Sequence, residues 1–158
     1  FLKYGEEGLK DVRENKASKA VEEVATDILV NTGYVSNLTN GDKYYYNSSL
    51  AHVFYNVSTS VKRDGEYLHG VLVSYGVLVL HAYDHNYEEF EKLARFNKKL
   101  GLPVTLEEIG LTRDDVREMA KKVYDTTEWQ KSEKALSEEK FVEAAFYADD
   151  YGKKLLAE

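Results

Sequence analysis

Cysteine is absent from this sequence of 158 residues, and proline occurs once, at Pro103. Without cysteine the chain has no disulfide framework and no thiolate nucleophile or ligand, which agrees with a cytoplasmic location. A single proline and few runs of alternating apolar and polar residues leave helix as the expected regular structure. The sequence therefore predicts an all-α protein.

Long apolar runs and excess positive charge are missing as well. The longest apolar run, residues 71–82, is interrupted by polar residues and is shorter than the roughly 20 residues that span a bilayer. The formal net charge is -7, and an acidic surface repels phosphate backbones. We therefore expect no membrane span and no nucleic-acid partner.

The chain is rich in hydrophobic residues, at 43%, and its length suits one domain over residues 1–158. It begins at Phe1, and the opening FLKYGEEGLKDVREN is typical of the middle of a helical region. We interpret the chain as a fragment that lacks an upstream portion. The thirteen tyrosines either mark a face that this portion covers or pack with their hydroxyls toward solvent.

Apolar spacing and capping residues predict a bundle of about six or seven helices. The expected helices cover residues 6–15, 18–33, 48–57, 69–83, 86–101, 113–125 and 138–156. Ser18, Ser48 or Ser49, Thr112 and Ser137 are the expected N-caps. Gly33 is expected to end the second helix, before a loop over residues 36–47 with an Asn-Gly-Asp turn at 40–42.

The helix over residues 69–83, HGVLVSYGVLVLHAY, is the most apolar, and this predicts the central, buried helix of the bundle. Gly70 and Gly76 each cost about 1 kcal/mol relative to alanine inside a helix. Glycines in such a helix usually allow another backbone or a ligand to approach closely.

Two of the four histidines, His52 and His69, are 17 residues apart and fall on adjacent predicted helices. A loop of about ten residues turns the chain back, so the two imidazoles are expected to converge. Neutral imidazole binds zinc or ferrous iron, but a catalytic site needs a third ligand. Spacing alone leaves open that both are hydrogen-bonded structural histidines. Asn56, four residues after His52, is placed to orient its imidazole.

Other candidate sites are weaker. His81 and His85 have i, i+4 spacing, but the pair straddles a helix end beside polar residues, which favours solvated helix-end side chains. No glycine-flanked serine elbow and no glycine-rich phosphate loop occur in the sequence. The many carboxylates fall on charged helix faces, which are usually solvated.

The segment around the two histidines resembles the glycerol dehydrogenase branch of the iron-containing alcohol dehydrogenase superfamily. Its pattern AHxxxN reads Ala51-His52-Val53-Phe54-Tyr55-Asn56 here, and the later HGxxVxxG-like segment begins at His69-Gly70 and reaches Gly76. Downstream, LGLPVTLEEIGL and the closing ADDYGKKLL are similar to further segments of the same family.

This resemblance implies the C-terminal helical domain of the dehydroquinate synthase-like and alcohol dehydrogenase fold. It implies an upstream α/β domain that binds NAD(P), and a divalent metal, zinc or iron, held between the domains by an aspartate and two histidines. His52 and His69 occupy the histidine positions, while the aspartate belongs upstream of Phe1. The implied reaction is oxidation of a small alcohol or polyol, with the metal polarising the alkoxide. The chain alone is then expected to be inactive, and a homo-oligomer is possible.

The sequence departs from the family pattern in four places. Tyr55 stands where a second histidine is common, and Val71 and Leu72 replace a charged pair. GDKYYYNSS replaces a glycine-rich segment before His52, and TTEWQKSEK replaces a late loop that contains histidine. Two alternatives therefore stay open: a divergent member that has lost its metal, and a helical interaction module without catalytic function.

Overall fold

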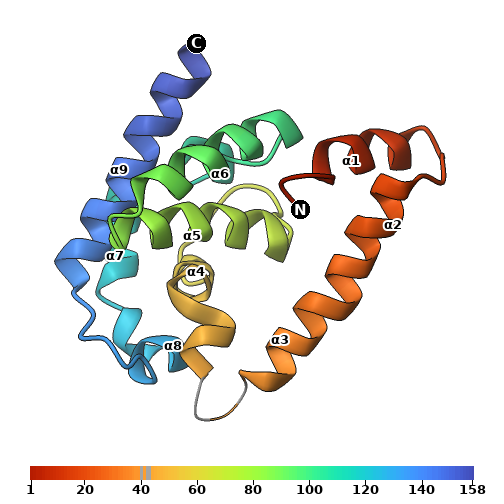
Figure 1. The fold of residues 1–158 in the computed structure, drawn as a ribbon. Coiled ribbons are helices and arrows are strands. Elements are labelled where there is room, and N and C mark those ends of the chain that lie inside the picture. Colours follow the sequence, from red (N-terminus) through yellow and green to blue (C-terminus); the bar gives the residue numbers. More distant parts are fainter. Residues whose placement is uncertain (40, 42–43) are drawn as a thin grey trace. The chain divides into compact units, whose positions relative to one another are not determined.

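The computed structural model describes residues 1–39, 41 and 44–158, and the chain forms two compact units, Phe1–Asp42 and Lys43–Glu158. We call them the N-terminal and C-terminal units. All regular elements of the described residues are helices, and seven of these helices have seven residues or more (Figure 1). The predicted all-α class and the number of helices are confirmed. The expectation of one domain over residues 1–158 stays a prediction.

The N-terminal unit is built from two helical segments. They comprise α1 (Gly5–Arg13), followed by α2 (Lys19–Thr26), the π-helical η1 (Asp27–Thr32) and α3 (Gly33–Leu38). The Ser18 hydroxyl accepts a hydrogen bond from the Val21 N–H at 3.3 Å, so the predicted N-cap is confirmed. α1 packs closely on α2, since a Cβ added at Gly8 would lie 3.3 Å from the Ala20 carbonyl oxygen.

The predicted end of the second helix is wrong. Gly33 has helical dihedral angles, φ −62° and ψ −47°, and the chain continues through it as α3 to Leu38. The predicted loop over residues 36–47 is therefore helical at its start, and it is helical again from Tyr44, where α4 begins. Asn40 and Asp42 of the predicted turn lie outside the described residues.

The C-terminal unit holds the remaining helices. They are α4 (Tyr44–Ser58), α5 (His69–Tyr83), α6 (Tyr87–Leu100), α7 (Arg113–Ala120), α8 (Thr127–Gln130) and α9 (Glu138–Ala157), with 3-10 turns η3 (Glu107–Ile109) and η4 (Val123–Asp125). Thr112 and Ser137 cap α7 and α9 as predicted, and Thr112 forms a reciprocal capping box with Asp115. α6 ends at Gly101 in the left-handed conformation that glycine favours.

The central position predicted for residues 69–83 is confirmed. α5 packs against α4, α6 and α9, and its buried residues include Leu72, Tyr75 and Val79 (Figure 1). The Tyr75 hydroxyl donates to the Ala145 carbonyl at 3.2 Å, which satisfies a polar group inside the core. Burial raises the pKa of Tyr75 well above its ordinary value, so this hydroxyl stays neutral. Across the described part of the chain, helices long and apolar enough to cross a bilayer are absent.

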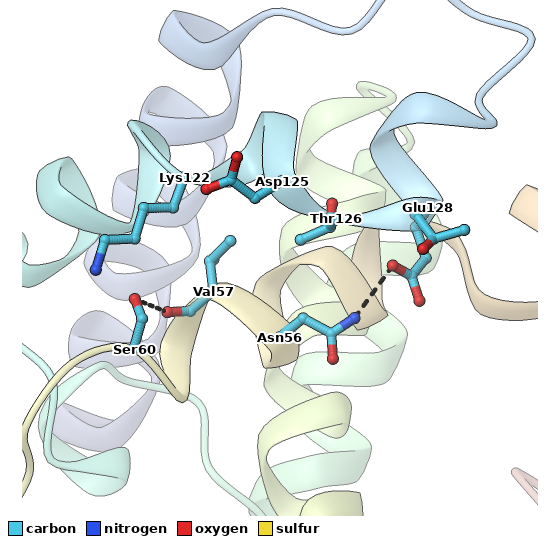
Figure 2. A pocket seen from close by; sticks show the side chains of 8 residues that line it. Asn56, Val57, Ser60, Lys122, Asp125, Thr126 and Glu128 are labelled. Atoms are coloured by element: carbon cyan, nitrogen blue, oxygen red, sulfur yellow. Dashed lines mark hydrogen bonds between the residues drawn. The ribbon is translucent and has the colours of Figure 1, made fainter.

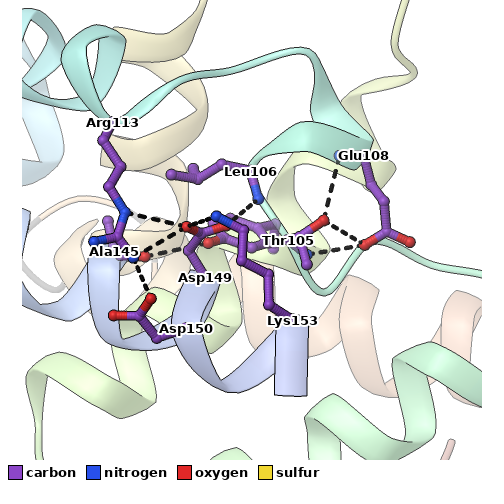
Figure 3. A network of polar contacts seen from close by, with 9 residues as sticks. Thr105, Leu106, Glu108, Arg113, Ala145, Asp149, Asp150 and Lys153 are labelled. Atoms are coloured by element: carbon purple, nitrogen blue, oxygen red, sulfur yellow. Dashed lines mark hydrogen bonds and ion pairs between the residues drawn. The ribbon is translucent and has the colours of Figure 1, made fainter. Parts of the chain in front are cut away.

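A buried carboxylate on α9 anchors the loop that enters α7. Asp149 accepts hydrogen bonds from the Leu106 N–H at 3.2 Å, from the Arg113 guanidinium at 3.3 Å and from the Lys153 ammonium at 2.7 Å (Figure 3). Burial alone would raise the pKa of Asp149. The bonds from Lys153, the Leu106 N–H and Arg113 outweigh burial and lower this pKa below its ordinary value. The carboxylate is therefore charged at neutral pH.

We expect Asp149→Asn to lower the free energy of unfolding at pH 7 by about 2 kcal/mol, because the hydrogen bonds from the charged Arg113 and Lys153 side chains are weakened. The pKa of Asp149 in the folded protein lies below the roughly 3.9 of an unfolded aspartate. The charged carboxylate therefore stabilises the folded state fully above the unfolded pKa, and this stabilisation is lost as the pH falls through the folded pKa. Urea titrations between pH 7 and pH 2 should show a smaller loss of stability on acidification in the variant. Asp150→Asn is the control, since exposed Asp150 pairs only with Arg113 among the printed contacts of the described residues. An equal effect of both substitutions would contradict the assignment.

Candidate metal site

The two histidines singled out by their spacing lie together. His52 is on α4 and His69 is the first residue of α5, and the loop over residues 59–68 turns the chain back between them. Their ring centroids are 5.3 Å apart. The predicted convergence of the imidazoles is confirmed.

The hydrogen bond of His52 fixes which of its nitrogens is free. Nδ1 lies 2.6 Å from the Ser48 carbonyl oxygen, which can only accept, so Nδ1 carries the proton and the Nε2 lone pair is left over. A backbone carbonyl on the far nitrogen is the usual partner of a metal-binding histidine. The predicted partner was wrong, because the Asn56 amide donates to Glu128 at 3.1 Å.

The second histidine is exposed but in contact with an aromatic ring. Tyr55, one turn along α4 from His52, meets the His69 ring edge to face at a centroid distance of 4.2 Å. Tyr55 is half-buried and packs against the core of the C-terminal unit. The tyrosine at the divergent position of the motif therefore orients the imidazole of His69.

The pair fits two positions of a tetrahedral metal ion. Zn–N bonds of about 2.0–2.1 Å and tetrahedral angles put the centroids of two imidazole ligands roughly 5 Å apart. The observed 5.3 Å matches that separation. A set of three or more metal-ligating side chains of the His, Cys, Asp or Glu kind is not found where the structure describes the chain. Among the described residues, two candidate ligands therefore lie together and a third of these residue types does not lie with them.

Close contact between two backbones fixes the spacing of the pair. A Cβ added at Gly76 of α5 would lie 2.5 Å from the carbonyl oxygen of Ala51, the neighbour of His52. Only glycine allows α4 and α5 to approach so closely, as expected for this residue. The same argument does not extend to Gly70, because a Cβ there would meet no atom within 4 Å.

A strained residue precedes His52. Ser49 lies inside the span of α4 with φ 55° and ψ −174°, a conformation that is almost reserved for glycine, and α4 is kinked there. Its hydroxyl accepts from the Ala51 N–H at 3.3 Å, as one of the expected caps of this helix. Ser49 lies in the GDKYYYNSS segment, so a serine holds a backbone conformation that glycine adopts most readily.

We expect Ser49→Gly to raise the free energy of unfolding by about 1 kcal/mol. The substitution relieves roughly 1–3 kcal/mol of backbone strain, which exceeds the combined cost of the lost hydrogen bond to the Ala51 N–H and of the greater conformational entropy of glycine in the unfolded chain. Thermal unfolding should show a rise in Tm of a few degrees. Ser74→Gly, in the regular part of α5, is the matched control and should lower Tm. A lower Tm for Ser49→Gly would show that the kink carries no strain.

A pocket of about 350 Å³ opens beside α4, one turn beyond His52. Asn56 and Glu128 form part of its wall and are joined by their hydrogen bond, while Lys122, just before η4, and Asp125, at the end of η4, also line it (Figure 2). Glu128 is buried, at 4% exposure. The sequence did not predict this burial, because the only feature noted in the TTEWQKSEK segment was that it contains no histidine. The hydrogen bond ties α8 to α4 and supports the helix that carries His52.

The other histidines are apart from this site. His81 lies in the last turn of α5, and His85 follows the helix with Nδ1 2.8 Å from the Tyr87 hydroxyl. The interpretation of the two residues as polar helix-end side chains agrees with these positions.

The chain was compared with known proteins in sequence and in structure. No family model matches the chain. In structure the chain is similar to a probable glycerol dehydrogenase from Sinorhizobium meliloti 1021, with a TM-score of 0.74, 17% identity, and coverage of 96% of this chain and 42% of that one. This likeness shows that the chain has the fold of a part of that protein.

In sequence the chain is 31% identical over 134 residues to the glycerol dehydrogenase of Thermotoga maritima. The match covers 81% of this chain and 34% of that protein, so the chain spans about a third of the length of this curated relative. The match falls in the C-terminal part of the relative, so the chain is similar to the C-terminal part of a glycerol dehydrogenase.

Proposed function

We propose that the chain is the metal-holding domain of an NAD(P)-dependent alcohol or polyol dehydrogenase. The observation that carries this proposal is the His52–His69 pair. Its ring centroids lie 5.3 Å apart, close to the roughly 5 Å expected for two imidazole ligands of one ion, and the hydrogen bond to the Ser48 carbonyl leaves Nε2 of His52 available. The similarity to glycerol dehydrogenases supports the class of reaction. The absence of cysteine supports a cytoplasmic location.

In this proposal each side chain of the site has a separate role. His52 and His69 donate imidazole nitrogens, and Tyr55 holds the exposed His69 ring against rotation. Asn56 and Glu128 fix the turn of α4 that carries His52. A bound zinc or iron ion supplies a Lewis acid that lowers the pKa of a substrate hydroxyl.

The remaining parts of the active site are assigned to protein outside this chain. An upstream α/β domain would bind NAD(P), and this cofactor would accept hydride from a small alcohol or polyol. An aspartate that follows that domain and precedes Phe1 would complete the ligand set. Because the described residues offer two of three ligands, we expect the chain by itself not to turn over. Oxidation of a simple alcohol with NAD by the purified chain would contradict this.

The experiment is a metal and activity assay on a protein that includes the upstream domain. We expect one equivalent of zinc or iron, NAD(P)-linked oxidation of a small polyol, and loss of both in His52→Ala and His69→Ala. His85→Ala is the control, because its side chain contacts Tyr87 instead of the pair. A metal-free protein that still oxidises alcohols would identify a divergent member without metal. A protein with neither metal nor activity, and unchanged stability in both variants, would favour a helical interaction module.

A further inference from the structure

The pocket beside α4 contains a carboxyl group that is buried and only partly hydrogen-bonded. Glu128 is 4% exposed and lines this pocket of about 350 Å³. One of its oxygens, Oε2, accepts a hydrogen bond from the Asn56 amide at 3.1 Å (Figure 2). The other oxygen, Oε1, has no hydrogen-bond or ion-pair partner among residues 1–39, 41 and 44–158. A carboxylate has about four acceptor sites, and its burial without a partner costs free energy, so a donor in the pocket would stabilise it.

The hydroxyl groups of the pocket wall also act as acceptors. The Ser60 hydroxyl donates to the Val57 carbonyl at 2.7 Å (Figure 2). The Thr126 hydroxyl donates to the Val123 carbonyl, also at 2.7 Å. Because the proton of each hydroxyl is already used, these two oxygens can offer only lone pairs to a bound molecule. The wall therefore fits a ligand that donates hydrogen bonds.

The charges around the pocket favour a cationic donor over a neutral one. Asp125 lines the pocket as a second carboxyl group, and Lys122 is the one ammonium of the lining. Neither of these two side chains forms an ion pair within the described part of the chain, and the Lys122 ammonium lies toward Ser60, away from the Glu128 carboxyl group (Figure 2). Groups of three or more side chains that could hold a metal ion are not found among the described residues. An organic cation therefore fits the pocket better than a metal ion.

We propose that this pocket binds the primary ammonium group of a small organic amine. The ammonium group combines a positive charge with three N–H donors, and it donates to Oε1 of Glu128 in a charge-assisted hydrogen bond. The volume of about 350 Å³ lies near the lower end of the roughly 300–1,000 Å³ of ligand pockets, so the rest of the molecule is short. This inference does not rest on the proposed function, because neither His52 nor His69 lines the pocket.

The test is a titration of the ¹⁵N-labelled chain with ethanolamine at pH 7, followed by the NMR shifts of the backbone amides. We expect saturable shifts centred on Asn56, Thr126 and Glu128, with a dissociation constant on the order of millimolar for so small a ligand. Glu128→Gln should weaken binding by at least about tenfold, because it removes the charge from the hydrogen bond. The glutamine carbonyl can still accept from Asn56, so this variant is expected to fold. Lys122→Ala should strengthen binding about twofold, because a competing positive charge is removed.

Three controls separate recognition of the ammonium group from weaker effects. Ethylene glycol replaces the ammonium group with a hydroxyl group, and sodium chloride matches the ionic strength. Glu91→Gln removes a carboxylate outside the pocket and should bind ethanolamine like the parent chain. Equal binding of ethylene glycol, the same shifts with sodium chloride, unchanged binding by Glu128→Gln, or no saturable shift would each overturn the proposal. None of these outcomes bears on the metal site, which is read from the histidine ring protons.

Discussion

We expect Gly152→Ala to lower the free energy of unfolding of the C-terminal unit by about 3 kcal/mol. A Cβ at this position of α9 would lie 1.8 Å from the carbonyl oxygen of Val104 and 2.6 Å from its carbonyl carbon. Neither is the end of a flexible side chain, so α9 or the loop must move. The gain in helix propensity, about 1 kcal/mol, does not offset such a clash.

The loop opposite Gly152 is held too firmly to yield. The Val104 and Thr105 N–H groups both donate to the Glu108 carboxylate at 2.9 Å, and the Leu106 N–H donates to Asp149 (Figure 3). A shift of the loop would break these hydrogen bonds. Urea unfolding followed by the fluorescence of Trp129, the single tryptophan and buried in this unit, measures the loss. Gly70→Ala is the control, since open space surrounds its Cβ position, and it should be more stable than the parent by up to about 1 kcal/mol. Equal stability of Gly152→Ala would mean that α9 does not sit against this loop.

The second large effect is expected from Gly76→Ala, at about 2–3 kcal/mol of unfolding free energy. Its Cβ would meet the Ala51 carbonyl oxygen at 2.5 Å and the Ala51 Cα at 3.0 Å. Relief requires α4 to move away from α5, and His52 moves with it. The substitution should therefore weaken metal binding as well as stability.

Both consequences can be separated by measurement. Trp129 fluorescence in urea reports stability, and titration with Zn²⁺ below the unfolding transition reports the histidine pair. Gly70→Ala again serves as the control, because it lies beside His69 in sequence but its Cβ would touch nothing within 4 Å. Unchanged zinc affinity in a destabilised Gly76→Ala would show that the α4–α5 contact does not set the spacing of the pair.

Local signals predicted most of the C-terminal unit. The apolar character of residues 69–83, which predicted a central helix, and the caps at Thr112 and Ser137 agree with the structure. Gly33 misled the prediction. A glycine usually ends a helix when the chain must turn, and here the helix continues through it at φ −62°.

The candidate site was predictable only in part. Spacing placed His52 and His69 on adjacent helices, but their pairing as ligands came from the family resemblance. The bond between Asn56 and Glu128 joins residues 72 apart, which no local pattern encodes. Ser49 in a glycine conformation has no signal in its own residue type. These features depend on tertiary packing, which overrides local preference.

Zinc titration of the chain followed by NMR of the histidine ring protons tests the central claim most directly. We predict that the resonances of His52 and His69 shift together and saturate at one ion per chain, with weak affinity because the described residues offer no third ligand of the usual kinds. The resonances of His81 and His85 should not shift at that stoichiometry, and His52→Ala should abolish the shift of His69. Independent shifts of His52 and His69, or shifts of all four histidines with equal affinity, would contradict a shared metal site.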